Sequence, residues 1–250
     1  CPKLEAIKQY IIGTRVIVGT TSMMTSKPFI FTLKHFKLAI IDESSQILEP
    51  NLIGLLSAVD KFILIGDYKQ LPAVVQQSEK DSSIPTINDS QKGGVIDMSI
   101  LQDICLTNCR NSLFERLIRW EDHEERTEFI GILRRQGRMH PEIAGFPNRM
   151  FYRREKLEPV PCPHQLESEL SYTLPSEDAL DDLLKEHRMI FLPSRFCKEP
   201  NVSDKINANE AEIVVDMLRR IHRFYGDRFD AQKTVGVIVP YRNQIAMVRK

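Results

Sequence analysis

The chain has 250 residues, of which 42% are hydrophobic and 27% are charged, a composition typical of a folded globular protein and not of a disordered one. Its 34 lysines and arginines balance its 34 aspartates and glutamates, so net charge alone does not indicate binding to nucleic acid. No run approaches the roughly twenty consecutive apolar residues of a membrane helix, and the first residues contain neither a charged leader nor a hydrophobic signal core, so we expect a cytoplasmic protein without a membrane partner.

The first predicted strands are the apolar runs Val16–Gly19 and Leu38–Ile41. The second run ends at two adjacent carboxylates, Asp42 and Glu43, with Gln46 three residues later. One acid of such a pair can hold the water shell of a magnesium ion while its neighbour orients or deprotonates an attacking water. Because open α/β sheets bind ligands at the carboxyl ends of their strands, the pair is a candidate site of nucleotide hydrolysis. The alternative is that the acids only cap the helix that follows.

A further predicted strand, Phe62–Ile65, leads directly into the loop Gly66–Pro72. The glycine permits a tight exit from the strand, and Asp67 and Gln70 place polar groups where they could sense a phosphate. The alternative is an ordinary turn in which the aspartate bonds to its own backbone. A helix predicted at 47–59 separates the two strands, so together they form a βαβ unit with a parallel sheet.

The middle of the chain has weaker patterns. Residues 76–99 are polar and contain Ser-Ser, Asn-Asp-Ser and Gly-Gly, which predicts a long surface loop. Leu113, Leu117 and Trp120 share one face of a predicted helix. The five cysteines contain no C-x-x-C pair and no zinc-site spacing, so we expect thiols in the core or on the surface.

An arginine-rich segment follows, with Arg134, Arg135 and Arg138 before a helix that Pro141 is predicted to begin. A guanidinium group there could neutralise charge on a transferring phosphoryl group. The alternative is a solvated basic turn. For His140, between the last arginine and the proline, we expect a structural hydrogen bond and not proton transfer.

The second half of the chain is predicted to be another α/β unit, which begins near Glu128. Its predicted strands are Met189–Leu192 and Thr234–Val239, and the acidic run 177–182 predicts a solvated helix face. Apolar residues at helical spacing predict an amphipathic helix that covers the sheet; they are Ala208, Ala211, Ile213, Val214, Met217, Leu218 and Ile221.

Taken together, these segments resemble superfamily 1 helicases, in the branch that contains the nonsense-mediated decay helicase and its DNA-repair relatives. Members carry an Asp-Glu-x-x-Gln, a Gly-Asp-x-x-Gln-Leu-Pro and a Gln-x-Arg-Met-His-Pro segment in that order, and all three occur here at 42–46, 66–72 and 136–141. The resemblance runs from about Val16 to Gln244. Further matches are Ser112–Leu117, Phe146–Asn148 with Phe151–Tyr152, Asn209–Ala211 and Val235–Gln244.

The resemblance implies a role for each matching residue. Asp42 matches the magnesium-shell aspartate of the family and Glu43 its catalytic base. Gln46 and Gln70 match glutamines near the nucleotide phosphates, and Gln70 is expected to link the state of the γ-phosphate to movement between domains. Arg138 matches an arginine that the second domain supplies. The other implied nucleotide-site residues are Gly66, Asp67 and Gln136, and the implied nucleic-acid contacts are Thr20, Thr21, Pro240, Tyr241 and Arg242.

Two departures from the family pattern are visible. The residue between the glutamine and the arginine of the third segment is commonly a tyrosine placed to stack on adenine, and here it is Gly137. The sequence also contains no Gly-Lys pair, so the G-x-x-x-x-G-K-[ST] phosphate loop is missing, as are the last two helicase segments. We therefore expect a piece of a longer protein that does not hydrolyse ATP at a useful rate by itself.

The expected fold is α/β, with two incomplete RecA-like parallel-sheet domains of the P-loop NTPase type at 1–127 and 128–250. The implied function is part of a helicase or translocase that uses ATP and Mg²⁺ to move 5′ to 3′ along single-stranded DNA or RNA. A nuclease or other domain could lie outside these residues. The alternative is a nucleic-acid-binding or scaffolding module that keeps the helicase architecture without motor activity.

Overall fold

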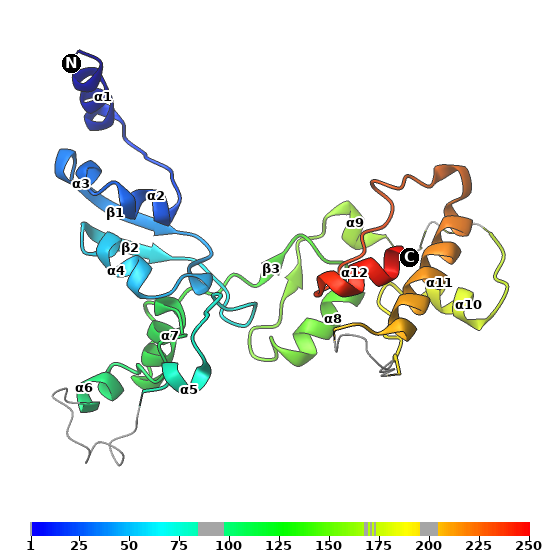
Figure 1. Cartoon of the computed structure of the whole chain (residues 1–250). Helices are drawn as coiled ribbons and strands as arrows, with labels where there is room; N and C mark the ends of the chain where they lie inside the picture. The colour runs from blue at the N-terminus through cyan, green and yellow to red at the C-terminus, as the bar shows by residue number, and fades with distance from the viewer. Residues whose placement is uncertain (1, 85–97, 168–169, 171, 173, 196–204) are drawn as a thin grey trace. The chain divides into compact units, whose positions relative to one another are not determined.

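The computed structural model describes residues 2–84, 98–167, 170, 172, 174–195 and 205–250. The chain divides into two compact units, Cys1–Ile132 and Leu133–Lys250 (Figure 1). The division lies five residues beyond the boundary expected from the sequence. None of the described helices is both long enough and apolar enough to cross a membrane.

Unit 1 contains a two-stranded parallel sheet, β1-β2, and helices on either side of it in the sequence. Its strands are β1 (Phe36–Ile41) and β2 (Val59–Leu64). Its helices are α1 (Pro2–Gly13), α2 (Thr21–Ser26), α3 (Phe29–Leu33), the 3₁₀ turn η1 (Ser44–Gln46), α4 (Pro50–Leu56), α5 (Glu79–Ser82), α6 (Met98–Asp103) and α7 (Leu113–His123).

The predicted βαβ unit is confirmed. β1 and β2 pair in parallel, with Ile40 opposite Ile63 and Ile41 opposite Leu64. The connecting helix α4 is shorter than the predicted 47–59, because Pro50 stands in its first turn and β2 already begins at Val59. The two strands therefore end side by side at one edge of the sheet.

The core of unit 1 lies between this sheet and helices α4 and α7. Ile41, Leu52, Leu55 and Leu113 are buried there, and Leu117 packs against them, as the predicted helical face requires. An ion pair closes the edge of this core: the Arg116 guanidinium of α7 donates to both carboxylate oxygens of Glu49, with N···O distances of 2.8 Å and 2.6 Å. The same guanidinium donates to the Ile104 carbonyl oxygen at 3.0 Å, so each of its three nitrogens makes a hydrogen bond inside the fold.

The predicted strand at Val16–Gly19 is wrong. The segment is irregular, and the Val18 side chain is 88% exposed. A strand needs a neighbouring backbone to complete its hydrogen bonds, and within the described part of unit 1 the only ladder is that of β1 and β2. Apolar composition without such a neighbour does not make a strand.

The loop predicted at 76–99 is also corrected. The helices α5 and α6 occupy its two ends, and Ser78 caps α5 by accepting a hydrogen bond from the Asp81 amide at 3.2 Å. Positions 85–97 of this predicted loop lie outside the described residues.

Unit 2 is mainly helical in its described part. Its two-residue strands β3 (Arg135–Gln136) and β4 (Glu158–Pro159) pair in parallel. Its helices are α8 (Pro141–Met150), α9 (Pro163–Leu166), α10 (Ala179–Glu186), α11 (Ala208–Tyr225), the 3₁₀ turn η3 (Gly226–Arg228) and α12 (Arg242–Arg249).

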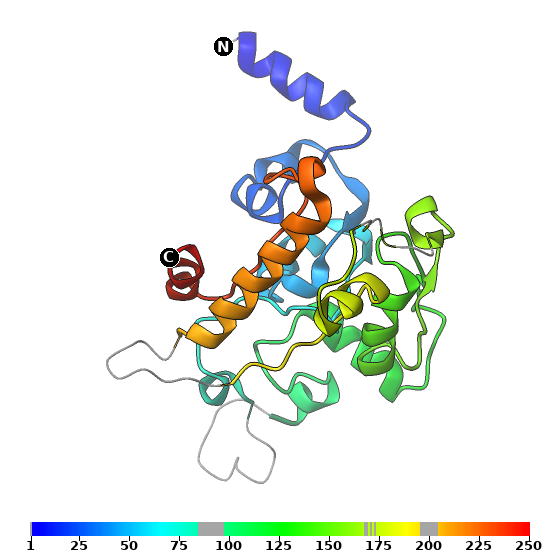
Figure 2. The same cartoon turned by 90° about the vertical axis from the view of Figure 1, so that its right-hand side faces the viewer.

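The predicted amphipathic helix is confirmed as α11, the long orange helix of Figure 2. It buries Ala211 and Phe224, and Asn207 caps its first turn. A paired hydrogen bond joins its start to α12: the Asn207 amide donates to the Gln244 side-chain oxygen, and the Gln244 side-chain nitrogen donates to the Asn207 carbonyl, both at 2.8 Å. Gln244 is buried, so this pair fixes α12 against α11.

The predicted strands at Met189–Leu192 and Thr234–Val239 are wrong. Both segments are irregular, and Phe191 and Ile238 are 88% and 97% exposed. Within the described residues of unit 2, the only β-ladder is that of β3 and β4, so neither segment completes its hydrogen bonds as a strand. The predicted helix therefore forms without the sheet that it was expected to cover.

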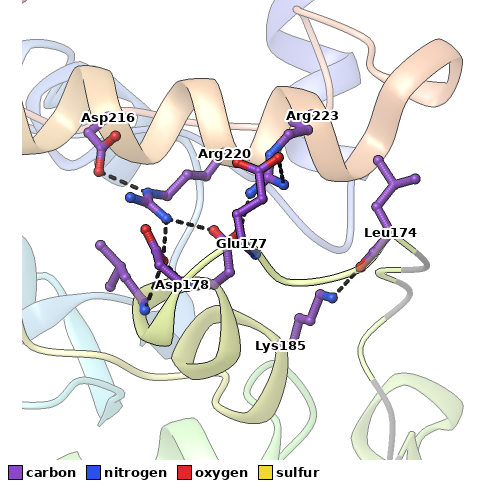
Figure 3. A network of polar contacts seen from close by, with 9 residues as sticks. Leu174, Glu177, Asp178, Lys185, Asp216, Arg220 and Arg223 are labelled. Carbon is purple, nitrogen blue, oxygen red and sulfur yellow. Dashed lines mark hydrogen bonds and ion pairs between the residues drawn. The ribbon is translucent and has the colours of Figure 1, made fainter.

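The sequence predicted that the acidic run 177–182 is a solvated helix face. In the structure, one residue of this run is buried. Asp181, on α10, is 0% exposed, and its carboxylate accepts hydrogen bonds from the Glu177 amide at 2.9 Å and the Arg220 guanidinium at 2.7 Å. It also accepts one from Arg223. Arg220 in turn bonds Asp178 at 2.7 Å and Asp216 at 2.9 Å (Figure 3). This ionic cluster joins α10 to α11.

The cluster keeps the buried carboxylate ionised. Burial by itself raises the pKa of Asp181, but the Glu177 amide and the two guanidinium groups outweigh it and lower that pKa to about 2. Because this lies below the ordinary value of 3.8, the ionised group stabilises the fold above about pH 4, and this stabilisation is lost as the pH falls toward 2.

Replacing Asp181 tests the cluster. We expect Asp181→Asn to lower the free energy of unfolding by about 3 kcal/mol, since it removes the shared partner of two guanidinium groups from a buried site. Asp182→Asn is the matched control, because Asp182 is the next residue of α10 and is exposed. Urea unfolding of both variants near pH 7 measures the difference. Equal stability of the two variants would contradict a structural role for the cluster.

Candidate functional site

The candidate site begins at the end of β1, where the chain turns through Asp42 and Glu43. The Asp42 carboxylate accepts a hydrogen bond from the Glu43 amide at 3.0 Å, and the Gln46 side chain donates to the Glu43 carboxylate at 3.1 Å. Asp42, Glu43 and Gln46 are all exposed. The structure thus brings these three predicted residues onto one turn that presents two carboxylates to solvent.

Glu43 has an unfavourable backbone conformation. Its φ of 52° and ψ of 33° are left-handed, a region that costs a residue with a side chain roughly 1–2 kcal/mol. The alternative reading, in which the acids cap the following helix, does not explain this conformation, because Glu43 makes no side-chain cap to η1. The surrounding contacts must therefore hold the Glu43 backbone in this conformation.

The second part of the site is the loop that leaves β2. The Asp67 carboxylate accepts hydrogen bonds from the Lys69 amide at 3.0 Å and from the Gln70 side chain at 2.9 Å. The Gln70 amide also donates to the Asp67 carbonyl at 3.2 Å. The alternative interpretation, a turn in which the aspartate side chain bonds to nearby backbone, is therefore correct for Asp67. Because the same carboxylate also binds the Gln70 side chain, it fixes the position of Gln70.

Two buried serines hold the two loops together. Ser44 donates to the Ile65 carbonyl from both its amide and its hydroxyl, each at 2.8 Å. The Ser45 hydroxyl accepts a hydrogen bond from the Asp67 amide at 3.2 Å. The Ile65 amide donates to the Ile41 carbonyl at 2.8 Å, so the hydrogen bonding of the sheet continues one residue beyond the end of β2.

Gly66 allows the two loops to approach closely. A Cβ atom at this position would lie 2.9 Å from the Ser45 amide nitrogen, a distance that real Cβ atoms essentially never show. Any other residue would push the loops apart. The structure thus confirms the tight exit predicted for this glycine and adds its cause, which is the buried serine turn and not the strand itself.

These residues fit a magnesium ion that a nucleotide helps to bind. Magnesium in nucleotide sites usually has one or two carboxylate ligands, the rest being phosphates and waters. Asp42 supplies an exposed carboxylate of this kind, with Glu43 beside it. Within the described residues, no group of three or more His, Cys, Asp or Glu side chains could hold a metal ion without such help.

In unit 2, the arginine segment is a turn shaped by one glutamine. The Gln136 side-chain oxygen accepts hydrogen bonds from the amides of Arg138 at 3.0 Å and Met139 at 2.6 Å, and its nitrogen donates to the Met139 carbonyl at 2.7 Å. The Gln136 amide group, predicted to bind nucleotide, is therefore used to fold the turn. Arg138 is exposed at its tip, and its guanidinium makes no hydrogen bond or ion pair with the residues that the structure describes.

Two residues that the sequence left without a role support this turn. Gln165, 2% exposed on α9, donates to the carbonyls of Gln136 and Met139, both at 2.9 Å. His164 lies 2.9 Å from the Gly137 carbonyl oxygen. The structural hydrogen bond expected for His140 is confirmed: it caps α8 by accepting from the Glu142 amide at 3.2 Å, and its other ring nitrogen lies 3.0 Å from the Glu167 carbonyl.

The predicted nucleic-acid contacts lie at the starts of two helices, α2 and α12, or directly before them. Thr20 caps α2 by accepting from the Met23 amide at 3.2 Å, and Thr21 is the first residue of that helix. Tyr241 is half exposed before α12, with the Lys205 ammonium group 5.5 Å from its ring centroid. Arg242 begins α12, and both it and Pro240 are exposed. A stacking ring beside two cations is suited to binding a single strand of nucleic acid.

Sequence reasoning selected charged and amide side chains and passed over Ser44 and Ser45. Both lie inside the first matched segment, but a serine pair after two acids is not by itself a signal. Burial is what distinguishes them, at 0% and 5% exposure. Gln165 and Asp181 were missed for the same reason, since a polar residue shows that it is buried only when its partners are known.

Comparisons with known proteins agree with the motif order. Sequence families described as "AAA domain" match residues 109–250, which is more than half of the chain, and residues 3–78. The chain is 28% identical to the DNA replication ATP-dependent helicase/nuclease DNA2 of Xenopus laevis, over 98% of the chain and 21% of that protein.

Two further relatives are similar over nearly the whole chain. It is 26% identical to an uncharacterised ATP-dependent helicase of Methanocaldococcus jannaschii, over 98% of the chain and 31% of the relative. It is also 26% identical to the DNA polymerase alpha-associated DNA helicase A of Saccharomyces cerevisiae, over 99% of the chain and 34% of the relative. The chain thus spans a fifth to a third of the length of these three relatives.

The close approach at Gly66 can be tested by adding one methyl group. We expect Gly66→Ala to lower the free energy of unfolding by about 1–3 kcal/mol, since the new Cβ would collide with the Ser45 backbone. Gly54→Ala is the matched control: this glycine lies inside α4 with nothing within 4 Å of an added Cβ, and alanine there should stabilise the helix. Urea unfolding of the chain compares the two. A Gly66→Ala variant as stable as Gly54→Ala would refute the close approach.

Proposed function

Because this chain belongs to superfamily 1 of the helicases, in the branch that contains the nonsense-mediated decay helicase and its DNA-repair relatives, we propose that the intact protein couples ATP hydrolysis to movement along single-stranded nucleic acid. The observation that carries the proposal is the joined pair of loops at the end of the β1-β2 sheet. It presents two exposed carboxylates and a positioned glutamine at one edge.

Each group on this edge has a task in the proposed hydrolysis. A magnesium ion there would neutralise charge on the phosphates and withdraw electrons from them. Asp42 would hold a water of the magnesium shell, and Glu43 would orient the attacking water and accept its proton. Gln46, which bonds the Glu43 carboxylate at 3.1 Å, would keep that group aimed at the water. Gln70 would contact the γ-phosphate.

Arg138 is proposed to stabilise negative charge on the phosphates. The Gln136 turn presents its guanidinium to solvent, where a planar group with five donors matches phosphate oxygens. Because Gln136 is occupied within its turn, we propose that it acts on the nucleotide through Arg138, without a contact of its own. Gly66 and Asp67 likewise act through the loop geometry and not by touching phosphate.

Single-stranded DNA is the track that we favour over RNA. Two relatives with similarity across nearly the whole chain carry names that specify DNA replication or a DNA helicase. Thr20, Thr21, Pro240, Tyr241 and Arg242 are the proposed contacts. Such loops hold the nucleic-acid backbone and stack on bases without reading sequence.

The name of the Xenopus laevis relative includes a nuclease, so we propose that the intact protein carries a nuclease domain outside these residues. We also propose a cytoplasmic location.

Glu43→Gln in the intact protein tests the proposed hydrolysis. The amide keeps the size of the side chain and an oxygen that can accept the Gln46 bond, but it cannot take a proton from water. We expect ATP turnover to fall by a factor of at least about 100, while ATP binding changes little. Glu79→Gln, which alters an exposed acid of α5, is the control. Strand-stimulated turnover that survives in Glu43→Gln would remove Glu43 from the role of base. Strand binding that ignores nucleotide in the unmodified protein would instead favour a binding module without motor activity.

Gly137→Tyr tests base recognition. A Cβ at this position would meet only the Cys162 sulfur, at an ordinary 3.8 Å, so the turn has room for a side chain. An aromatic ring there could stack on a purine. We expect the variant to lower the KM for ATP by roughly threefold to tenfold while the KM for CTP changes less. Gly137→Ala separates the ring from the loss of glycine. Equal changes for the two nucleotides would show that this position does not contact the base.

A further inference from the structure

The Ser45 hydroxyl connects the backbones of the two site loops. It accepts the Asp67 amide at 3.2 Å, and the Asp67 carboxylate accepts the Gln70 side chain at 2.9 Å. Ser45 therefore fixes the residue that fixes Gln70. Only 5% of the Ser45 surface is exposed, so the hydrogen bond between Ser45 and the Asp67 amide is shielded from competing water.

On its other side, Ser45 is next to the groups that hold Glu43. It lies on η1 directly before Gln46, whose side chain donates to the Glu43 carboxylate at 3.1 Å. The turn is short, and the Glu43 backbone within it is left-handed. A displacement of the Ser45 backbone would therefore also displace Glu43. The chain of contacts Gln70–Asp67–Ser45–Gln46–Glu43 is thus continuous.

The neighbouring Ser44 differs in one respect. Its hydroxyl and its amide donate to the same acceptor, the Ile65 carbonyl, both at 2.8 Å. Loss of the Ser44 hydroxyl would leave the backbone bond in place. Loss of the Ser45 hydroxyl would leave the Asp67 amide without the acceptor that the structure gives it.

We infer that Ser45 is a positioning residue that couples Gln70 to Glu43, so that movement of the β2 loop changes the aim of the proposed base. The inference rests on the proposed function, because it assumes that Gln70 senses the nucleotide and that Glu43 acts on water. Gly66 makes the coupling stiff: the absence of its Cβ lets the Asp67 loop lie directly on the Ser45 backbone.

A double-mutant cycle in the intact protein tests this coupling through kcat for ATP. Ser45→Ala and Gln70→Ala should each lower kcat by roughly tenfold or more, with the KM for ATP within about twofold of the unmodified value. If the two residues act as one unit, the double variant should lose no more than about threefold beyond the more impaired single variant. Circular dichroism and a melting temperature well above the assay temperature establish that each variant is folded.

Ser44→Ala combined with Gln70→Ala is the matched cycle. Its effects should multiply to within about twofold, because the Ser44 hydroxyl duplicates a backbone bond. Multiplying effects in the Ser45 cycle as well would overturn the coupling while leaving the proposed function intact. An intact protein that shows no ATP hydrolysis would overturn the proposed function and the inference with it.

Discussion

The parallel pairing of β1 with β2 is the constraint on which the candidate site depends. Because the strands run in the same direction, their carboxyl ends meet at one edge, and the segments that follow them must share that edge. Ser44 and Ser45 extend the contact beyond the last ladder bond, and Gly66 lets the second loop close onto the first. The loop that carries Asp42 and Glu43 is therefore bonded to the loop that carries Gln70, although more than twenty residues separate the acids from the glutamine.

In unit 2, as at the candidate site, hydrogen bonds and ion pairs with other segments hold the buried polar groups in position. Asp181 stays ionised at 0% exposure because two guanidinium groups and an amide surround it. Gln136 and Gln165 use their amides to close the turn that presents Arg138. Charge at the surface is thus available for ligands, while charge and amides inside hold the surface groups in position. Glu43 shows the cost of this arrangement, since its left-handed backbone persists only because neighbouring bonds hold it.

Local patterns succeeded where a segment carries its own structural reason. The strands predicted at 38–41 and 62–65 correspond to β1 and β2, because each apolar run has a partner strand across a short helix. The helix predicted from Ala208 is α11, because apolar residues at helical spacing can bury one face of a helix. The α/β fold class of P-loop helicase domains was likewise confirmed by the family matches. Three segments have strand composition but form no β-ladder within the described residues, because composition cannot supply a pairing partner: Val16–Gly19, Met189–Leu192 and Thr234–Val239.

The sequence by itself determined the family and the residue types of the candidate site. The order of three short motifs, each with residue types suited to phosphate and metal, is local information that survives without any contact being known. Only the tertiary structure decided which polar residues work inside the fold. The roles of Ser44, Ser45, Gln136 and Asp181 arise from segments brought together across the sequence, and a hydrogen bond between distant segments leaves no mark at either position alone.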